Sequence, residues 1–152
     1  MILPSPTIFS KPRRTIKRVF IHCSAKDEPE FDDISVIRRW HVQGNGWRDV
    51  GYHYFIKKDG TVQTGRNMDA SPAAQEGHNQ NTIAICLHGL ENDKFTPEQF
   101  HSLRALCEMI RQKIPTVTFH GHCEVNKGKT CPVFNYRKIL SLDNKGNMKG
   151  DL

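Results

Sequence analysis

Two apolar stretches of this sequence end in histidine, and a cysteine follows the second one. VFIHC places His22 at the end of a run typical of a buried strand, and TVTFHGH does the same with His122. Cys131 follows His122 by nine residues. Imidazole and thiolate are ligands that Zn²⁺ prefers, and three protein ligands leave a fourth position for water or substrate. The residue types therefore predict a catalytic zinc site.

The spacing alone leaves other interpretations open, because the chain has eight histidines and five cysteines. A histidine at a strand end is often a satisfied core residue, since imidazole can form a hydrogen bond at either nitrogen. A free cysteine usually behaves as a small buried apolar side chain. A more specific signal is needed to favour a metal site over these structural roles.

The elements that would position these residues follow one another as strands and helices. RVFIHCS, residues 18–24, predicts a central strand, and DDISVIRRWHVQ, residues 32–43, has the apolar spacing of a helix after an Asp cap. On this spacing we expect Trp40, and also Trp47, in the core rather than as platforms for a glycan. YHYFIKK and TVQT, joined by Asp59-Gly60, predict a hairpin.

The second half of the chain repeats the alternation. Residues 65–81 predict a long loop over one face of the sheet, and TIAICLHG predicts a buried strand. TPEQFHSLRALCEMIRQKI is the clearest helix, with a capping box formed by Thr96 and Gln99. A strand at 116–120 and a short helix near YRKIL complete an α/β domain with a mixed sheet flanked by helices, and we expect the zinc cleft on one face.

Composition and charge limit the class of protein. A chain of 152 residues with 37% hydrophobic residues fits one domain, and no apolar run approaches the roughly 18 residues that span a bilayer. The first 18 residues place their charges after a short apolar patch, the reverse of a secretory signal. We therefore expect no membrane insertion, no signal peptide, and a cytoplasmic location until another protein releases the chain.

The cysteines bear on the redox state of the cellular compartment, and the net charge bears on the charge of the binding partner. The five cysteines form an odd set without the paired spacing of a disulfide scaffold, which favours a reducing compartment. The net charge of +6 favours a polyanionic partner, and by itself it does not choose among nucleic acid, acidic glycan and a membrane surface.

Five motifs resemble one known family in the same order along the chain. FIHCSA, IRRWHVQGNGWRDVGYHYFIKKDGTVQTGR, HNQNTIAICLHG, FTPEQFHSLRAL and GHCEVNKGKTCP are similar to the zinc-dependent N-acetylmuramoyl-L-alanine amidases, which include the peptidoglycan recognition proteins. The likeness is greatest to the amidases of T-odd coliphages, historically called lysozymes. It covers roughly residues 18–140. We expect an amidase domain at 18–142 between a basic tail at 1–17 and a C-terminal tail at 143–152.

The resemblance implies roles for individual residues. It makes His22, His122 and Cys131 the zinc ligands, Lys129 a catalytic residue, and Tyr52 a residue beside the metal. By strand alternation Tyr52 and His53 point to opposite faces, so His53 is expected in the core or behind the site.

The chain departs from the family pattern in two places. The loop between His122 and Cys131 is one residue longer than in the phage enzymes, which could move Lys129. Many relatives also carry a histidine where this chain has Ala73-Ala74-Gln75. Whether the nearby His78 substitutes is open, and so is the role of Cys123.

The implied function is hydrolysis of the amide bond between N-acetylmuramic acid and L-alanine in peptidoglycan, as in a phage or prophage endolysin. Lys129 would hold the developing oxyanion and Tyr52 would orient water or join that site. No general base can be assigned, although Glu124 lies near a ligand in the sequence. We expect peptidoglycan, and not nucleic acid, as the partner, and we expect a monomer.

Two alternative functions belong to other classes. Superfamily members that lack the cysteine ligand bind peptidoglycan without cutting it, and the presence of Cys131 argues against that role here. A protein-interaction role, such as inhibition of a polymerase through the basic tail, could coexist with hydrolysis.

Overall fold

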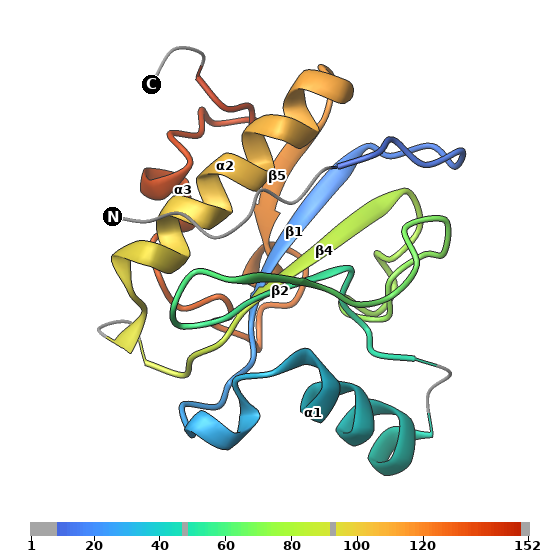
Figure 1. Ribbon diagram of the computed structural model, residues 1–152. Helices are drawn as coiled ribbons and strands as arrows, with labels where there is room; N and C mark the ends of the chain where they lie inside the picture. The colour runs from blue at the N-terminus through green and yellow to red at the C-terminus, as the bar shows by residue number, and fades with distance from the viewer. Residues whose placement is uncertain (1–8, 47–48, 92–93, 150–152) are drawn as a thin grey trace.

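The computed structural model describes residues 9–46, 49–91 and 94–149, and its elements alternate between strands and helices (Figure 1). A five-stranded sheet has the order β3-β2-β4-β1-β5. The elements are β1 (Arg18–Cys23), η1 (Pro29–Phe31), α1 (Ile34–Arg39), η2 (Trp40–Gly44), β2 (Tyr54–Ile56), β3 (Val62–Thr64), β4 (Thr82–Leu87), α2 (Pro97–Lys113), β5 (Thr118–Gly121), η4 (His122–Glu124) and α3 (Tyr136–Ile139).

The sheet is mixed, as predicted. Strand β1 lies between β4 and β5 and is parallel to both, and β2 is parallel to β4. The predicted hairpin is the one antiparallel pair, β2 with β3, and Gly60 in its turn has a φ of 89°. Because parallel strands end at the same edge, the carboxyl ends of β1, β4 and β5 lie together, which is where α/β sheets commonly place ligands.

Helix α2 covers one face of the sheet. Its apolar stripe, Leu103, Leu106, Cys107 and Ile110, is fully buried against the residues of β1 and β4 that point to the same side, such as Ile21 and Ile85. The predicted capping box is present, because Gln99 N–H donates to Thr96 Oγ1 and Thr96 N–H donates to Gln99 Oε1. The clearest helix of the sequence therefore begins at the predicted residues.

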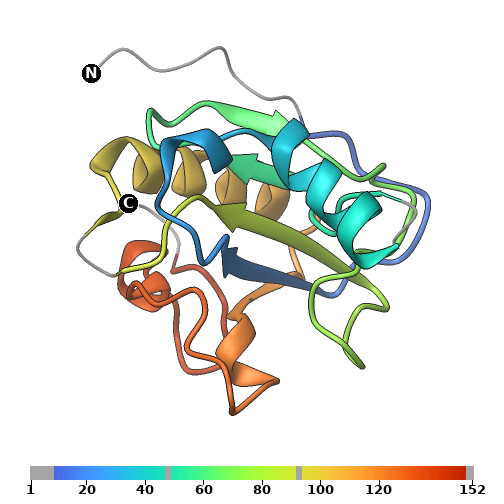
Figure 2. The same ribbon diagram turned by 90° about the horizontal axis from the view of Figure 1, so that it is seen from below.

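Helix α1 lies on the opposite face, as Figures 1 and 2 show. Asp33 caps it by accepting a hydrogen bond from Ser35 N–H, and Ile34 and Ile37 pack with Phe55 and Cys86 of the sheet. The two helices thus bury alternate residues of the same strands, which is what a two-sided α/β layer requires.

Trp40 differs from the prediction. Its side chain is 42% exposed, whereas His41, the next residue, is 5% exposed. The core-facing stripe that begins with Ile34 and Ile37 continues through His41, so Trp40 lies at the border of the stripe and the prediction of a core position was wrong. Trp47 lies outside the described residues.

The described parts of the two predicted tails contribute to the core. Phe9 and Ile16, which precede β1, are 2% and 5% exposed, and Met148 near the other end is 6% exposed. All three belong to the core cluster on the α2 face. Within the described ranges, the helices are too short or too polar to cross a membrane.

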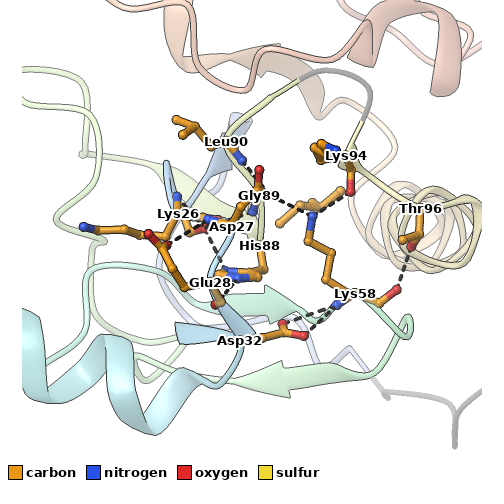
Figure 3. Close-up of polar contacts among 12 residues, drawn as sticks. Lys26, Asp27, Glu28, Asp32, Lys58, His88, Gly89, Leu90, Lys94 and Thr96 are labelled. Atoms are coloured by element: carbon orange, nitrogen blue, oxygen red, sulfur yellow. Dashed lines mark hydrogen bonds and ion pairs between the residues drawn. The ribbon is translucent and has the colours of Figure 1, made fainter. Parts of the chain in front are cut away.

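Polar contacts anchor the segment that follows β1 (Figure 3). Lys58 is at the centre: its Nζ donates to Asp27 Oδ1 at 3.0 Å and to the Lys94 carbonyl at 2.6 Å, and its backbone N–H donates to the Asp32 carboxylate at 3.2 Å. Thr96 Oγ1 donates to the Lys58 carbonyl at 2.6 Å. These bonds tie the segment leaving the end of β1 to β2 and to the start of α2.

Candidate metal centre

Three side chains converge at the carboxyl ends of β1 and β5. His22 is the penultimate residue of β1, His122 follows β5 directly, and Cys131 lies in the loop beyond it. The potential ligand atoms of the three lie within 4.8 Å of one another. The His22 and His122 rings have centroids 4.7 Å apart, and Cys131 Sγ is 3.9 Å from His22 Nδ1. Zinc bonds of about 2.0–2.3 Å in tetrahedral geometry place neighbouring donors roughly 3.3–3.8 Å apart. The donor set therefore fits one zinc ion, with donor spacings slightly wider than a bound ion requires.

His22 is held in a neutral, buried state. Its side chain is 1% exposed, and burial together with the nearby His122 lowers its pKa to about 3. Its Nε2 lies 2.8 Å from Oε1 of the fully buried Gln75. A neutral imidazole with one nitrogen bonded to the protein keeps the other nitrogen for a metal.

His122 sits on a short turn that Glu124 secures. Glu124 Oε2 accepts from Gly121 N–H at 2.9 Å and from the Tyr136 hydroxyl, and Oε1 is 2.9 Å from His120 Nδ1. Burial alone would raise the pKa of Glu124, but these hydrogen bonds together lower it. Both carboxylate oxygens are therefore engaged in holding the turn that carries the ligand.

Cys131 receives support from β1. The backbone N–H of Cys23 donates to Cys131 Sγ at 3.1 Å, and the backbone N–H of Cys123 donates to the Cys131 carbonyl at 2.9 Å. The hydrogen bond to the Cys23 thiol and burial raise the pKa of the Cys131 thiol. A cation next to this sulfur would favour the thiolate instead, because a coordinating thiol loses its proton.

Tyr52 lies beside two buried histidines, the candidate ligand His22 and His41. Its ring centroid is 5.3 Å from that of His22 and 5.6 Å from that of His41. Burial raises the pKa of Tyr52 well above its usual value, so the phenol keeps its proton and can donate a hydrogen bond.

His53 serves the fold. It is 1% exposed, its Nδ1 accepts from Ala84 N–H at 3.1 Å, and its Nε2 donates to the Ala70 carbonyl at 2.8 Å. Tyr52 and His53 precede β2 instead of lying within it, so strand alternation does not apply to them, although their side chains do have different surroundings.

Lys129 lies on the exposed loop between His122 and Cys131, where its backbone N–H donates to the Asn126 carbonyl at 3.0 Å. Burial lowers the pKa of His122, and the positive charge of Lys129 lowers it further. The ammonium group therefore acts electrostatically on His122, one of the three candidate ligands.

Gln75 is the site residue that reasoning from sequence missed. It occupies the segment where the family resemblance indicates a histidine, and that departure was the signal that could have identified it. His78, considered as a substitute, contributes its backbone carbonyl, which accepts from Gln75 Nε2 at 3.3 Å.

Comparison with known proteins agrees with this geometry. The family model for N-acetylmuramoyl-L-alanine amidase matches residues 12–134. The endolysin of Enterobacteria phage T3 is 40% identical over 134 residues, covering 84% of this chain and 87% of that protein. The endolysin of Escherichia phage T7 is 39% identical with the same coverage.

A solved structure extends the likeness to the fold. The endolysin N-acetylmuramoyl-L-alanine amidase LysCS from Clostridium intestinale superposes with a TM-score of 0.75 at 26% identity, covering 91% of each chain. Drosophila PGRP-LB, at 22% identity and a TM-score of 0.69, shares the fold. The match over most of the chain, together with the converging histidines and cysteine, establishes that this chain belongs to the N-acetylmuramoyl-L-alanine amidase family.

Proposed function

We propose that this amidase hydrolyses the bond between N-acetylmuramic acid and L-alanine of peptidoglycan with a zinc ion held by His22, His122 and Cys131. The observation that carries the proposal is the convergence of three zinc-type donor atoms within 4.8 Å in a chain of this family. The retained thiol distinguishes the chain from a module that binds peptidoglycan without cutting it.

Zinc bound at this centre supplies a Lewis acid that polarises a carbonyl and lowers the pKa of water from about 15.7 toward 7. The protein supplies the surroundings. His22 and His122 stay neutral at physiological pH because burial lowers both pKa values, so their nitrogens are available as ligands. The backbone N–H of Cys23 stabilises negative charge on Cys131.

Lys129 is the proposed oxyanion stabiliser. Its charge acts on His122, and it lies on the loop that joins the candidate ligands His122 and Cys131. When the carbonyl of the scissile amide becomes tetrahedral, negative charge develops on its oxygen, and a positioned ammonium group stabilises that charge by about 3 kcal/mol. The electrostatic effect of Lys129 on His122 supports this role in a loop that we expect to be one residue longer than in the phage enzymes.

Tyr52 is the proposed hydrogen-bond donor beside the metal. Its protonated phenol lies next to His22, where it orients water or donates to the developing oxyanion. Glu124 is not assigned as a general base, because both of its oxygens bond to Gly121, His120 and Tyr136.

Mass spectrometry of the products released from purified peptidoglycan by the zinc-loaded protein tests this function. We expect free stem peptides that begin with L-alanine and glycan strands that retain the lactyl group. If glycan and peptide stay joined while the protein still sediments with the wall, the chain is a binding module and the proposal is wrong.

We further propose an endolysin role, in which the chain acts as a monomer, accumulates in the cytoplasm, and reaches the wall when another protein opens the membrane. The likeness to phage endolysins over 84% of the chain supports this role. Expression with and without a pore-forming phage protein checks it: lysis should require that second protein.

A further inference from the structure

A chain of hydrogen bonds with one fixed direction ends at His22. Thr82 Oγ1 donates to the Asn79 carbonyl at 2.8 Å, which uses the single hydroxyl proton. Thr82 Oγ1 must then accept from Gln75 Nε2, which is 2.8 Å away. The same Nε2 also donates to the His78 carbonyl at 3.3 Å. The two carbonyl oxygens can only accept, so they set the direction of every bond between them and Gln75.

This direction fixes the orientation of the Gln75 amide. A flipped amide would place its oxygen against the His78 carbonyl and its NH₂ group against His22. In the observed orientation Gln75 Oε1 faces His22 Nε2 at 2.8 Å, and an amide oxygen can only accept. His22 Nε2 must therefore carry the ring proton.

The consequence for His22 is a single neutral tautomer. With the proton on Nε2, the lone pair of the ring lies on Nδ1, the nitrogen that faces Cys131 Sγ at 3.9 Å. Gln75 is 0% exposed, so water does not compete for these bonds. The backbone is held as well, because Asn79 Oδ1 accepts from the N–H groups of Ala74 and Gln75 at 3.2 and 3.0 Å.

We infer that Gln75 is a positioning residue for the metal centre, which selects Nδ1 of His22 as the zinc ligand through the Asn79–Thr82–Gln75–His22 hydrogen bonds. This inference rests on the proposed zinc site. An acceptor on the second nitrogen of a ligating histidine fixes its tautomer and ring orientation, and loss of such a partner typically weakens metal binding about 10–100-fold.

The test measures zinc affinity by chelator competition in the full-length protein. Gln75→Leu removes the acceptor that faces His22 Nε2. The matched control is Gln99→Leu, because Gln99 is also 0% exposed and its Nε2 donates to the Ile56 and His88 carbonyls, neither of which belongs to a candidate ligand. Thermal unfolding of each variant reports any general loss of stability.

We expect Gln75→Leu to bind zinc about 10–100-fold more weakly than wild type. Gln99→Leu should lose thermal stability but keep wild-type zinc affinity. The inference is overturned if folded Gln75→Leu binds zinc as tightly as Gln99→Leu.

A second variant covers the case in which Gln75→Leu does not fold. Thr82→Val leaves Gln75 in place but removes the hydroxyl that orients its amide, so zinc affinity should fall between wild type and Gln75→Leu. Wild-type zinc affinity in folded Thr82→Val would contradict the role of the Asn79–Thr82–Gln75–His22 hydrogen bonds. Failure of the wild-type protein itself to bind zinc would instead refute the proposed function, so the two failures are distinguishable.

Discussion

His22 and His88 are two buried histidines at the ends of neighbouring parallel strands, and they have different hydrogen-bonding partners. Both are almost completely buried, at 1% and 0% exposed. His88 uses both nitrogens within the fold. Its Nδ1 lies 3.0 Å from Ser24 Oγ. Its Nε2 lies 2.9 Å from the Glu28 carbonyl, and both of these residues are labelled in Figure 3. His22 uses Nε2 for Gln75 and directs Nδ1 toward Cys131.

The difference separates a structural histidine from a metal-binding one. Burial is the same, and burial is the first cause that lowers the pKa of each ring. What distinguishes His22 is one nitrogen aimed at other ligand atoms. Substitutions at the metal centre should therefore affect zinc and activity, whereas substitutions elsewhere should affect stability or have little effect.

The largest contrast is expected between His22→Ala and His88→Gln. His22→Ala should lose stoichiometric zinc and all detectable peptidoglycan hydrolysis. His88→Gln should keep zinc, and its unfolding free energy should fall by about 1–3 kcal/mol from lost buried hydrogen bonds. Metal analysis and urea denaturation measure both effects. Equal loss of zinc in the two variants would remove the basis of the comparison.

Cys23 and Cys131, which contact each other in the fold, offer a second contrast. Cys131→Ser should lose zinc and activity together. Cys23→Ser should retain both, because the backbone N–H of residue 23 is unchanged and a serine hydroxyl can replace the thiol as a hydrogen-bonding partner of Cys131. Zinc content and hydrolysis rates of the purified variants provide the readout. Retention of tightly bound zinc in Cys131→Ser would exclude the thiolate as a ligand.

Two lysines of one exposed loop provide a smaller contrast. Lys129→Ala should keep zinc and lower kcat by about 10²–10³, the usual loss when one oxyanion donor is removed. Lys127→Ala changes the same charge two residues away and should leave kcat near wild type. Full activity in Lys129→Ala, or loss of its zinc, would contradict the assigned role.

The pH dependence of stability should reveal the fold-serving histidines. Burial lowers the pKa of His53 to about 4, from an ordinary value of 6.5. The unfolded chain therefore binds a proton that the folded chain excludes, so the unfolding free energy falls as the pH drops from about 6.5 to about 4. This group accounts for up to about 3 kcal/mol of the fall. Urea denaturation at several pH values should show a shallower slope for His53→Gln; an unchanged slope would refute this assignment.

The sequence predicted most of the sheet and its helices because their signals are local. The capping box of Thr96 and Gln99 and the Asp59-Gly60 turn each depend on a few adjacent residues, and all are present in the structure. Trp40 was misplaced because helical spacing alone does not say which of two adjacent residues lies at the border of the buried stripe.

The candidate metal centre could be predicted only in part. His22, His122 and Cys131 were named from residue type and family resemblance, but FIHC and CLHG look alike as strand ends, so the sequence does not separate His22 from His88. Gln75 contacts His22 across 53 residues, from a loop without periodicity. Its role depends on tertiary placement and on the direction of hydrogen bonds, which no local pattern encodes.

X-ray absorption at the zinc edge of the zinc-loaded protein tests the central claim most directly. We predict one sulfur ligand at about 2.3 Å and two imidazole nitrogens at about 2.0–2.1 Å. A spectrum with only nitrogen and oxygen ligands, or with more than one sulfur, would contradict a zinc centre built from His22, His122 and Cys131.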